Sequence, residues 1–365
     1  MFNSVYKNKR VLVTGHTGFK GSWMSIWLNS LGAKVYGLSL DPNCSPSNYD
    51  QCDLRSQLAG DFRADVTCKQ DVQKIINDVQ PEFIFHLAAQ ALVKDSYKDP
   101  VRTMAVNAIG TANVLDAVRS IKSKVTVILI TSDKCYDNVE FLWGYKETDR
   151  LGGKDPYSAS KAMAEIAINS FVNSYFTESA NVNLGVGRAG NVIGGGDWSA
   201  NRIIPDCVQA WSRGETVDIR SPKATRPWQH VLEPLSGYLH LGSVLYNSKS
   251  VNGEAFNFGP PSNSNFSVEQ LIEKMSSYWD QVSWKDTSAD SDHVHEAGLL
   301  RLNCEKAQTL LDWESVMNFD ETVQLTSAWY QGFYSSTSPQ MLEITIEQIQ
   351  HYVELAVIRG RKWVK

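Results

Sequence analysis

Short apolar runs alternate with longer segments of helical spacing through the first half of the chain. The runs that predict strands are 10–15, 34–40, 82–89, 124–130 and 183–190. The segments that predict helices are 20–31, 70–79, 101–120 and 157–176. Because such alternation produces right-handed β–α–β crossovers, we expect an α/β fold with a doubly wound, mainly parallel sheet of the Rossmann type.

The pattern changes in the second half. Residues 190–206, GNVIGGGDWSANRIIPD, are rich in glycine and polar side chains, and short mixed elements follow. A later run, 254–259, predicts a strand that returns to the sheet, and 339–360 predicts a packed amphipathic helix. We therefore expect a first domain over 1–190 and a smaller mixed α/β lobe over 191–365, some segments of which return to the first domain.

Composition excludes several classes of protein. The chain has 365 residues and a formal net charge of -5, so it offers no basic footprint for nucleic acid or an anionic membrane. No apolar run approaches the ~18 residues that span a bilayer, and the first residues are too polar for a signal peptide. The six cysteines form no CxxC pair, which favours reduced thiols. We expect a cytoplasmic protein without a metal site, and we interpret four histidines as structural: His16, His86, His230 and His295.

Three glycines follow the first predicted strand in a GxxGxxG pattern that leads into the first predicted helix. This spacing permits a tight turn and a close approach of the backbone to a pyrophosphate at the helix N-terminus. The pattern alone is weak evidence, but its place near the start of the chain predicts a dinucleotide site. The expected residues of this site are Gly15, Thr17, Gly18, Phe19 and Gly21.

An acidic residue, Asp41, ends the second predicted strand. Its carboxylate can bind both hydroxyls of an adenine ribose and would repel a 2′-phosphate. No Lys or Arg stands between 42 and 54 to accept such a phosphate, so the sequence favours NAD over NADP. The alternative is that Asp41 only begins the next loop. Asp65 and Val66 are further candidates for the adenine end of the cofactor.

A tyrosine and a lysine stand one helical turn apart in YSASK, as Tyr157 and Lys161. The pKa of an ordinary tyrosine is about 10, which is too high for an efficient base at neutral pH. An ammonium group alongside favours the phenolate and lowers that pKa. We therefore expect Tyr157 to take a hydroxyl proton while NAD takes the hydride from the same carbon, with Lys161 lowering the pKa of the tyrosine.

These motifs together resemble a known family. GxxGxxG, HLAAQ (86–90), TSD after an apolar strand, and YSASK are similar to the extended short-chain dehydrogenase/reductases over nearly the whole chain. Within that family, TGHTGFKGSW, TSDKCYDN, DPYSASK, RAGNVIGGGDW and RPWQHVLEPLSGYL resemble the CDP-glucose 4,6-dehydratases. The resemblance implies that Leu87, Ala88 and Ala89 of HLAAQ contact the cofactor.

The resemblance implies a lyase that converts CDP-D-glucose to CDP-4-keto-6-deoxy-D-glucose and water. In this cycle the C4 hydroxyl is oxidised, water leaves from C5 and C6, and the hydride returns to C6, so NAD acts as a tightly held catalyst. Exclusion of water would protect the unsaturated intermediate. The activity resembles the first step toward the dideoxysugars of bacterial lipopolysaccharide O-antigen. The domain over 1–190 would then bind NAD and the lobe over 191–365 the nucleotide sugar.

TSDK, which follows the fourth of the predicted strands, carries the residues that the resemblance assigns to dehydration. Ser132 would bond the C4 oxygen, and Asp133 would protonate the leaving C6 hydroxyl. Lys134 stands where most related dehydratases carry a glutamate, so it either acts as the C5 base, which needs a lowered pKa, or orients Asp133 and water. The alternative is a solvated strand end. It is opposed by the position of TSDK at the carboxyl end of a parallel strand, where doubly wound folds bind ligands.

Substrate-binding residues are expected in the second lobe. By resemblance, Asn191 binds the diphosphate or the sugar. Three arginines, Arg202, Arg226 and Arg301, would clamp the diphosphate or the nucleotide, because guanidinium groups match phosphate oxygens in pairs. Each arginine alone is more often a surface residue.

Other functions stay open at this point. A 4-epimerase of the same family needs no acid/base pair at 133–134, and GDP-mannose or dTDP-glucose 4,6-dehydratases usually carry Glu at position 134. A non-catalytic NAD-sensing regulator commonly lacks the Tyr–Lys pair, which is present here. The family commonly dimerises through two long helices, here 101–120 and 157–176, so we expect a homodimer or a homotetramer.

Overall fold

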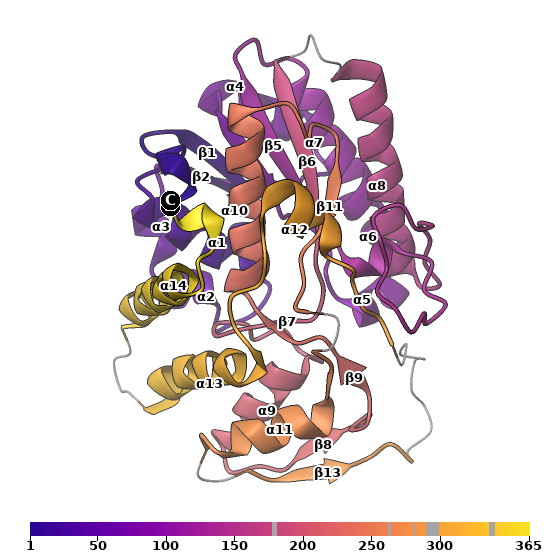
Figure 1. Cartoon of the computed structure of the whole chain (residues 1–365), viewed down its shortest axis with the longest axis vertical. Helices are drawn as coiled ribbons and strands as arrows, with labels where there is room; N and C mark the ends of the chain where they lie inside the picture. The colour runs from indigo at the N-terminus through magenta and orange to yellow at the C-terminus, as the bar shows by residue number, and fades with distance from the viewer. Residues whose placement is uncertain (177–180, 262–263, 280–281, 290–298, 336–339) are drawn as a thin grey trace.

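The computed structural model describes residues 1–365 except 177–180, 262–263, 280–281, 290–298 and 336–339. Its centre is a seven-stranded sheet in the order β11-β6-β5-β4-β1-β2-β3, and every neighbouring pair is parallel (Figure 1). The strands are β1 (Arg10–Thr14), β2 (Lys34–Ser39), β3 (Gly60–Arg63), β4 (Phe83–His86), β5 (Val125–Ile130), β6 (Val182–Arg188) and β11 (Ala255–Asn257). The expected doubly wound, mainly parallel sheet is therefore confirmed.

Helices cover both faces of this sheet (Figure 1). One face carries α4 (Lys69–Val79), α7 (Gly110–Val118) and α8 (Pro156–Tyr175). The other face carries α1 (Phe19–Ser30) and α10 (Leu232–Asn247), and α14 (Met341–Ile358) packs outside α1. Both faces of β5 are fully buried, which explains why its sequence, VTVILI, is continuously apolar.

Two elements differ from the expectation. The strand β3 was not predicted, because GDFR contains one large apolar side chain and lies at the edge of the sheet. The segment 101–120 is not one regular helix, since α6 (Pro100–Met104) is followed by a π-helical turn, Ala105–Ile109, before α7. The strand predicted at 254–259 is β11, and it returns to pair with β6 as expected.

A smaller lobe lies below the sheet in Figure 1. It contains the helices α9 (Ile203–Trp211), α11 (Val268–Ser276) and α13 (Phe319–Ser335). Three short strand pairs accompany them: β7 (Val192–Ile193) with β10 (Gln229–His230), β8 (Val217–Ile219) with β13 (Trp284–Asp286), and β9 (Thr225–Arg226) with β12 (Phe266–Ser267). The largest cluster of buried apolar side chains continues from the sheet into this lobe, and the boundary at residue 190 stays a prediction.

Short helices complete the described chain. They are η1 (Phe2–Ser4), α2 (Asn48–Gln51), α3 (Leu54–Gln57), α5 (Val93–Lys98), η3 (Asp133–Cys135), α12 (Glu305–Leu311) and η4 (Lys362–Val364). The helix predicted at 339–360 is α14, and position 339 lies outside the described residues. Among the helices that the structure describes, none is long and apolar enough to cross a membrane.

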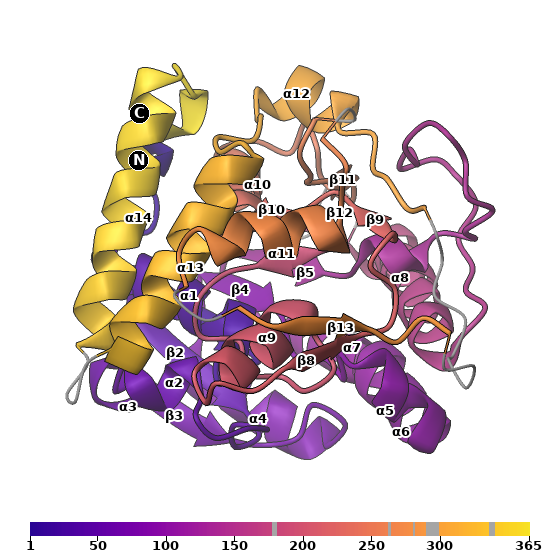
Figure 2. The same ribbon diagram turned by 90° about the horizontal axis from the view of Figure 1, so that it is seen from below.

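The two ends of the chain meet in one corner of the molecule (Figure 2). The N–H of Asn3 donates to the carbonyl oxygen of Lys365 at 2.9 Å. The rings of Phe2 and Trp363 stack with centroids 5.1 Å apart, and Trp27 of α1 meets Trp363 edge to face at 6.1 Å. The first and last residues are therefore packed together against α1.

Candidate active site

The exit of β5 holds a buried carboxylate. Ser132 caps the short helix η3, because its Oγ accepts the N–H of Lys134 at 3.2 Å. The same hydroxyl donates to Oδ1 of Asp133 at 2.9 Å. Asp133 is 3% exposed, and it lies so close to Gly190 that a Cβ at that glycine would collide with the carboxylate. The sequence thus places one acid in a fixed position at the carboxyl edge of the sheet.

Helix α8 brings the tyrosine and the lysine to that acid. Asp155 caps the helix, since its carboxylate accepts the N–H of the third helical residue at 2.9 Å. Tyr157 therefore lies in the first turn, where its hydroxyl hydrogen-bonds the Ser132 side chain. One turn later, Nζ of Lys161 donates to the carbonyl oxygen of Ile130 at 3.5 Å. The structure brings Ser132, Asp133, Tyr157 and Lys161 together.

Burial has the largest effect on the pKa values of Tyr157 and Lys161. It raises the pKa of Tyr157 to about 12, against the opposing hydrogen bond from Ser132 and the charge of Arg202. It also lowers the pKa of Lys161 to about 8. Desolvation therefore outweighs the effect of nearby cations on Tyr157, of which Arg202 is one, and the expectation that Lys161 lowers the pKa of Tyr157 stays a prediction. The predicted role of Tyr157 as a base is untested.

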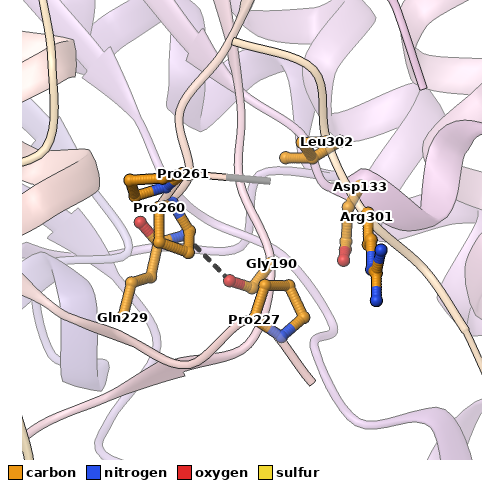
Figure 3. A pocket seen from close by; sticks show the side chains of 9 residues that line it. Asp133, Gly190, Pro227, Gln229, Pro260, Pro261, Arg301 and Leu302 are labelled. Atoms are coloured by element: carbon orange, nitrogen blue, oxygen red, sulfur yellow. Dashed lines mark hydrogen bonds between the residues drawn. The ribbon is translucent and has the colours of Figure 1, made fainter. Parts of the chain in front are cut away.

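A pocket opens beside Asp133 (Figure 3). Its lining residues are Asp133, Gly190, Pro227, Gln229, Gly259, Pro260, Pro261, Arg301 and Leu302. Gln229 braces the pocket by donating from Nε2 to the carbonyl oxygen of Gly190 at 2.9 Å. Figure 3 shows Asp133 and Arg301 next to each other on one side. A cation from the second half of the chain thus shares a pocket with the buried acid.

The other predicted substrate residues lie around this region. Nη1 of Arg202 donates to Asp197 Oδ2 at 2.7 Å, and Arg202 acts on the pKa of Tyr157. Asn191 follows Gly190 and has a left-handed φ of 50°. Arg226 bonds the carbonyl oxygen of Thr225 at 2.9 Å and precedes Pro227 of the pocket. Their roles, like that of Lys134 in η3, stay predictions.

The loop between β1 and α1 fits a dinucleotide. A Cβ at Gly21 would collide with the carbonyl oxygen of Gly15, so the turn closes only with glycine. The hydroxyl of Thr17 donates to a backbone carbonyl at the end of β2 at 2.9 Å. The N–H of Ala88, after β4, donates to the Thr14 hydroxyl of β1 at 3.1 Å. Gly18 caps α1 with its backbone and Phe19 opens the helix. Three strand ends are thereby held around one loop.

A cation lies beside Asp41, the residue predicted to bind the adenine ribose. Nε of Arg63, on the unpredicted strand β3, donates to Oδ1 of the exposed Asp41 at 2.8 Å. The same arginine bonds Asp61 and the hydroxyl of Tyr49, the latter at 2.8 Å. A hollow of about 290 Å³ opens beside these residues and is lined also by Arg55. The segment 42–54 contains no Lys or Arg, as the sequence showed, but β3 brings Arg63 to Asp41 from outside that segment.

The remaining residues that were predicted to bind the cofactor already make contacts within the protein. Asp65 accepts Nη2 of Arg102 at 2.5 Å and the N–H of Thr67 at 2.9 Å. Val66 is buried and packs against Gly110 of α7. Leu87 and Ala89 are half-buried at the exit of β4. Binding of the cofactor by these residues stays a prediction.

The histidines occupy packed positions. His86 lies between the hydroxyls of Thr14, at 2.8 Å, and Thr111, at 3.1 Å, and burial lowers its pKa to about 3. Burial also lowers the pKa of His230 to about 3, and His16 bonds Asp61 at 2.8 Å. His295 lies outside the described residues. In the part of the chain that is described, no cluster of three or more His, Cys, Asp or Glu side chains could hold a metal ion.

Comparison with known proteins decides the family. A family model described as GDP-mannose 4,6 dehydratase matches residues 12–326. The chain belongs to this family. A CDP-glucose 4,6-dehydratase of Salmonella typhimurium is 42% identical over 339 residues, which are 90% of this chain and 92% of that protein.

Solved structures of other proteins show the same fold. Pal from Bacillus thuringiensis superposes with a TM-score of 0.76 at 24% identity, covering 89% of this chain and 99% of that one. A UDP-glucose 4-epimerase from Brucella ovis, solved in complex with NAD, has a TM-score of 0.72 at 19% identity and covers 88% of this chain and 98% of that one.

In this member of the GDP-mannose 4,6 dehydratase family, sequence reasoning missed a buried ion pair beside the site. Glu165 accepts Nε and Nη2 of Arg188 at 2.8 and 2.9 Å and the hydroxyl of Thr131 at 2.5 Å. Arg188 also donates to the hydroxyl of Tyr136 at 2.8 Å. Glu165 stands four residues after Lys161, so the helical spacing could have revealed it.

Proposed function

We propose that this protein is a CDP-glucose 4,6-dehydratase, a hydro-lyase that uses NAD. One observation carries the proposal: the buried carboxylate of Asp133 shares the Ser132 hydroxyl with Tyr157. A tyrosine–lysine pair alone would serve any oxidoreductase of this fold, whereas loss of water also needs an acid for the leaving hydroxyl. The 42% identity to a protein with this activity supports the choice of CDP-glucose.

The glycine loop and the ends of β1, β2 and β4 would hold NAD, and Lys161 would hold its nicotinamide ribose. The chemistry supplied by NAD bound there would be hydride transfer, from C4 of the hexose and back to C6. Structural neighbours solved in complex with NAD support a cofactor of this type. Asp41 and Arg63 would lie at the adenine ribose.

The chain's own residues would move the protons. Tyr157 takes the proton of the C4 hydroxyl, and Ser132 bonds the C4 oxygen. Because burial keeps the pKa of Tyr157 at about 12, its ionisation in the cycle depends on cations that gather around it, of which Arg202 is one. Asp133 then gives a proton to the leaving C6 hydroxyl. The hydroxyl of Ser132 links Tyr157 to Asp133. The proton that Tyr157 takes from the C4 hydroxyl can therefore replace the proton that Asp133 gives to the C6 oxygen.

The direct test is incubation with CDP-glucose, dTDP-glucose, UDP-glucose and GDP-mannose in separate reactions with NAD. Mass spectrometry then measures loss of one water from each sugar. We expect loss from CDP-glucose alone. Loss from a different sugar would change the assigned nucleotide, and an epimerised product of unchanged mass would contradict the dehydratase assignment.

We further propose a cytoplasmic homodimer or homotetramer that supplies dideoxysugar synthesis for O-antigen. Large apolar side chains are exposed on the helices that the family commonly pairs: Val101 on α6, Ile109 in the π-helical turn, and Met163 and Ile166 on α8. Covering them with a second copy would remove this apolar surface from water.

A further inference from the structure

His16 in the glycine loop reaches a strand that is not adjacent to its own. It follows β1 in the chain, and the sheet places β2 between β1 and β3. Nε2 of His16 nevertheless lies 2.8 Å from Oδ1 of Asp61 on β3. The side chain of His16 is 0% exposed and that of Asp61 is 12% exposed, so the contact is shielded from water. The glycine loop and β3 are thereby joined across β2.

The strand β2 leaves room for this crossing at a glycine. A Cβ at Gly37 would lie 2.4 Å from the ring of His16, so no larger residue fits there while the ring stays in place. The ring also packs edge to face against Tyr49 of α2, with centroids 5.6 Å apart. Gly37 and Tyr49 therefore hold the imidazole in the position from which it reaches Asp61.

Asp61 connects His16 with the residues beside the predicted adenine ribose. Its Oδ2 accepts the hydroxyl of Tyr49 at 2.6 Å, and its Oδ1 accepts Nη1 of Arg63. Nε of Arg63 donates in turn to Oδ1 of Asp41 at 2.8 Å. Since Asp61 keeps Tyr49 and Arg63 as partners without His16, the group around Asp41 can form by itself. His16 ties this group to the glycine loop.

The hydrogen bond from His16 has a defined direction. Burial lowers the pKa of His16, against the hydrogen bond with Asp61, so the ring is neutral and has one N–H. Nε2 is the nitrogen that faces the carboxylate, and the proton therefore lies there. Nη1 of Arg63 lies 3.3 Å from Nε2, but a guanidinium can only donate, and its acceptor is Asp61. One directed bond thus runs from the loop to β3.

We propose that His16 is a positioning residue for the cofactor: by bonding Asp61, it fixes the spacing between the glycine loop, which would hold the pyrophosphate of NAD, and Asp41, which would hold its adenine ribose. This role rests on the use of NAD in the proposed function. A dinucleotide contacts both places at once, so a loop already held at the correct spacing loses less conformational freedom when the dinucleotide binds. A ligand that contacts only one of the two places gains nothing from that spacing.

The test compares ligands that contact one or both places. Adenosine reaches only the ribose side, whereas ADP and NAD also reach the glycine loop through their phosphates. His16→Leu removes the hydrogen bond and keeps an apolar side chain, and His16→Gln keeps an amide N–H that can bond Asp61. Gly37→Ala displaces the ring without changing it. The control is His240→Leu on α10, because His240 bonds the carbonyl oxygen of Leu311 at 2.6 Å and lies outside this group. Isothermal titration calorimetry measures each dissociation constant.

We expect His16→Leu and Gly37→Ala to weaken the binding of NAD and ADP by about tenfold and to change that of adenosine by less than about twofold. His16→Gln should recover most of the affinity for NAD and ADP. His240→Leu should bind all three ligands as the parent does. Urea unfolding shows whether each variant folds, and Gly37→Ala carries the comparison if His16→Leu does not.

Three results would overturn the positioning role of His16. They are unchanged binding of NAD and ADP in His16→Leu, an equal loss for adenosine and ADP, and no recovery in His16→Gln. A parent that binds neither NAD nor ADP would overturn both this role and the proposed use of NAD. A parent that binds both but removes no water from CDP-glucose would overturn the proposed reaction and leave the role of His16 standing.

Discussion

Asp41 is exposed at the end of β2, and its carboxylate is bound by Arg63. The arginine is shared with Asp61, so its charge is largely balanced in place. A 2′-phosphate on the adenine ribose would meet both carboxylates, while two ribose hydroxyls could bond the free oxygen of Asp41. The ion pair therefore supports a preference for NAD even though a cation stands close by.

Asp41→Asn should weaken this preference. Removing one negative charge leaves Arg63 able to bind a phosphate, so the ratio of the dissociation constants for NADP and NAD should fall by about tenfold. Quenching of tryptophan fluorescence by each dinucleotide measures these constants. The control is Asp50→Asn. Asp50 lines the same hollow but does not bond Arg63, so its substitution should leave the ratio of the two dissociation constants unchanged. An unchanged ratio in Asp41→Asn would contradict the interpretation.

At the scale of elements, the pair between Glu165 and Arg188 fixes how α8 sits against the sheet. Glu165 lies on the helix of Tyr157 and Lys161, and Arg188 ends β6. Through Thr131 the same carboxylate reaches the exit of β5. The distance between the tyrosine and the buried acid of the site thus depends on one ion pair whose side chains are each at most 5% exposed.

Glu165→Gln should lower both stability and kcat. It leaves the guanidinium of Arg188 buried without its anion, which costs about 3–5 kcal/mol of unfolding free energy. The double variant Glu165→Met/Arg188→Met should recover most of that stability, because an apolar pair of similar size needs no charge compensation. Urea unfolding and steady-state kinetics measure the two effects. If the pair positions the site, kcat of the double variant should stay at least about tenfold below that of the parent, with KM little changed. If kcat recovers together with stability, the pair has a purely structural role.

The elements that the sequence predicts well are those with continuous burial. The runs of β5 and β6 are buried at every position, so their apolar composition is unmistakable. The strand β3 has no such run and was not predicted. The position of Arg63 beside Asp41 was therefore not predicted either, because Arg63 lies on that strand. Ser132 and Asp133 could be predicted because one short motif contains them both. The hydrogen bond between Tyr157 and Ser132 could not, because it depends on how α8 packs relative to the end of β5.

At the scale of the whole molecule, exposed apolar residues on α6 and α8 predict self-association. Val101 is 75% exposed and Ile166 is 61% exposed, values that favour burial against a second copy.

Ile166→Glu should convert the oligomer to smaller species, because the buried charge would lack a partner in the interface. Sedimentation velocity measures the change. Ile358→Glu, on α14, replaces a side chain that is 79% exposed on another helix and should leave the assembly intact. A monomeric parent, or an Ile166→Glu variant that still sediments as the parent does, would contradict the expected interface.

The carboxylate of Glu233 joins three distant parts of the chain. It lies on α10, accepts the N–H groups of Val316, at 2.9 Å, and Met317, at 2.6 Å, and accepts the hydroxyl of Tyr352 on α14 at 2.9 Å. Burial raises its pKa to about 7, and these hydrogen bonds oppose only part of the rise.

Stability should therefore depend on pH through Glu233. Its pKa in the folded state exceeds the ordinary value of 4.5, so the folded state binds more protons between these values. The free energy of unfolding should fall by about 3 kcal/mol from this group as pH rises from about 4.5 to 7 and stay lower above that. Glu233→Gln should lack this fall in urea unfolding at pH 5 and 8.

Glu321→Gln provides a control of opposite sign. Burial works against ionisation of Glu321, but hydrogen bonds from Arg359 and the N–H of Asn318 outweigh it and lower its pKa. Its stabilisation is lost as pH falls rather than as pH rises. A Glu233→Gln variant with the same pH dependence as the parent would refute the assignment.

The packing of Phe2 and Trp27 against Trp363 has a consequence for synthesis of the chain. The ribosome makes Trp363 long after Phe2 and Trp27, so these two rings stay without this partner during most of the synthesis. Until Trp363 is made, the segment that carries the glycine loop exposes the rings of Phe2 and Trp27. Chaperones can bind such exposed rings, and proteases can cleave the chain beside them. Nascent chains that have not reached Trp363, and chains that stop before it, would share these exposed rings, so quality control would recognise both through Phe2 and Trp27.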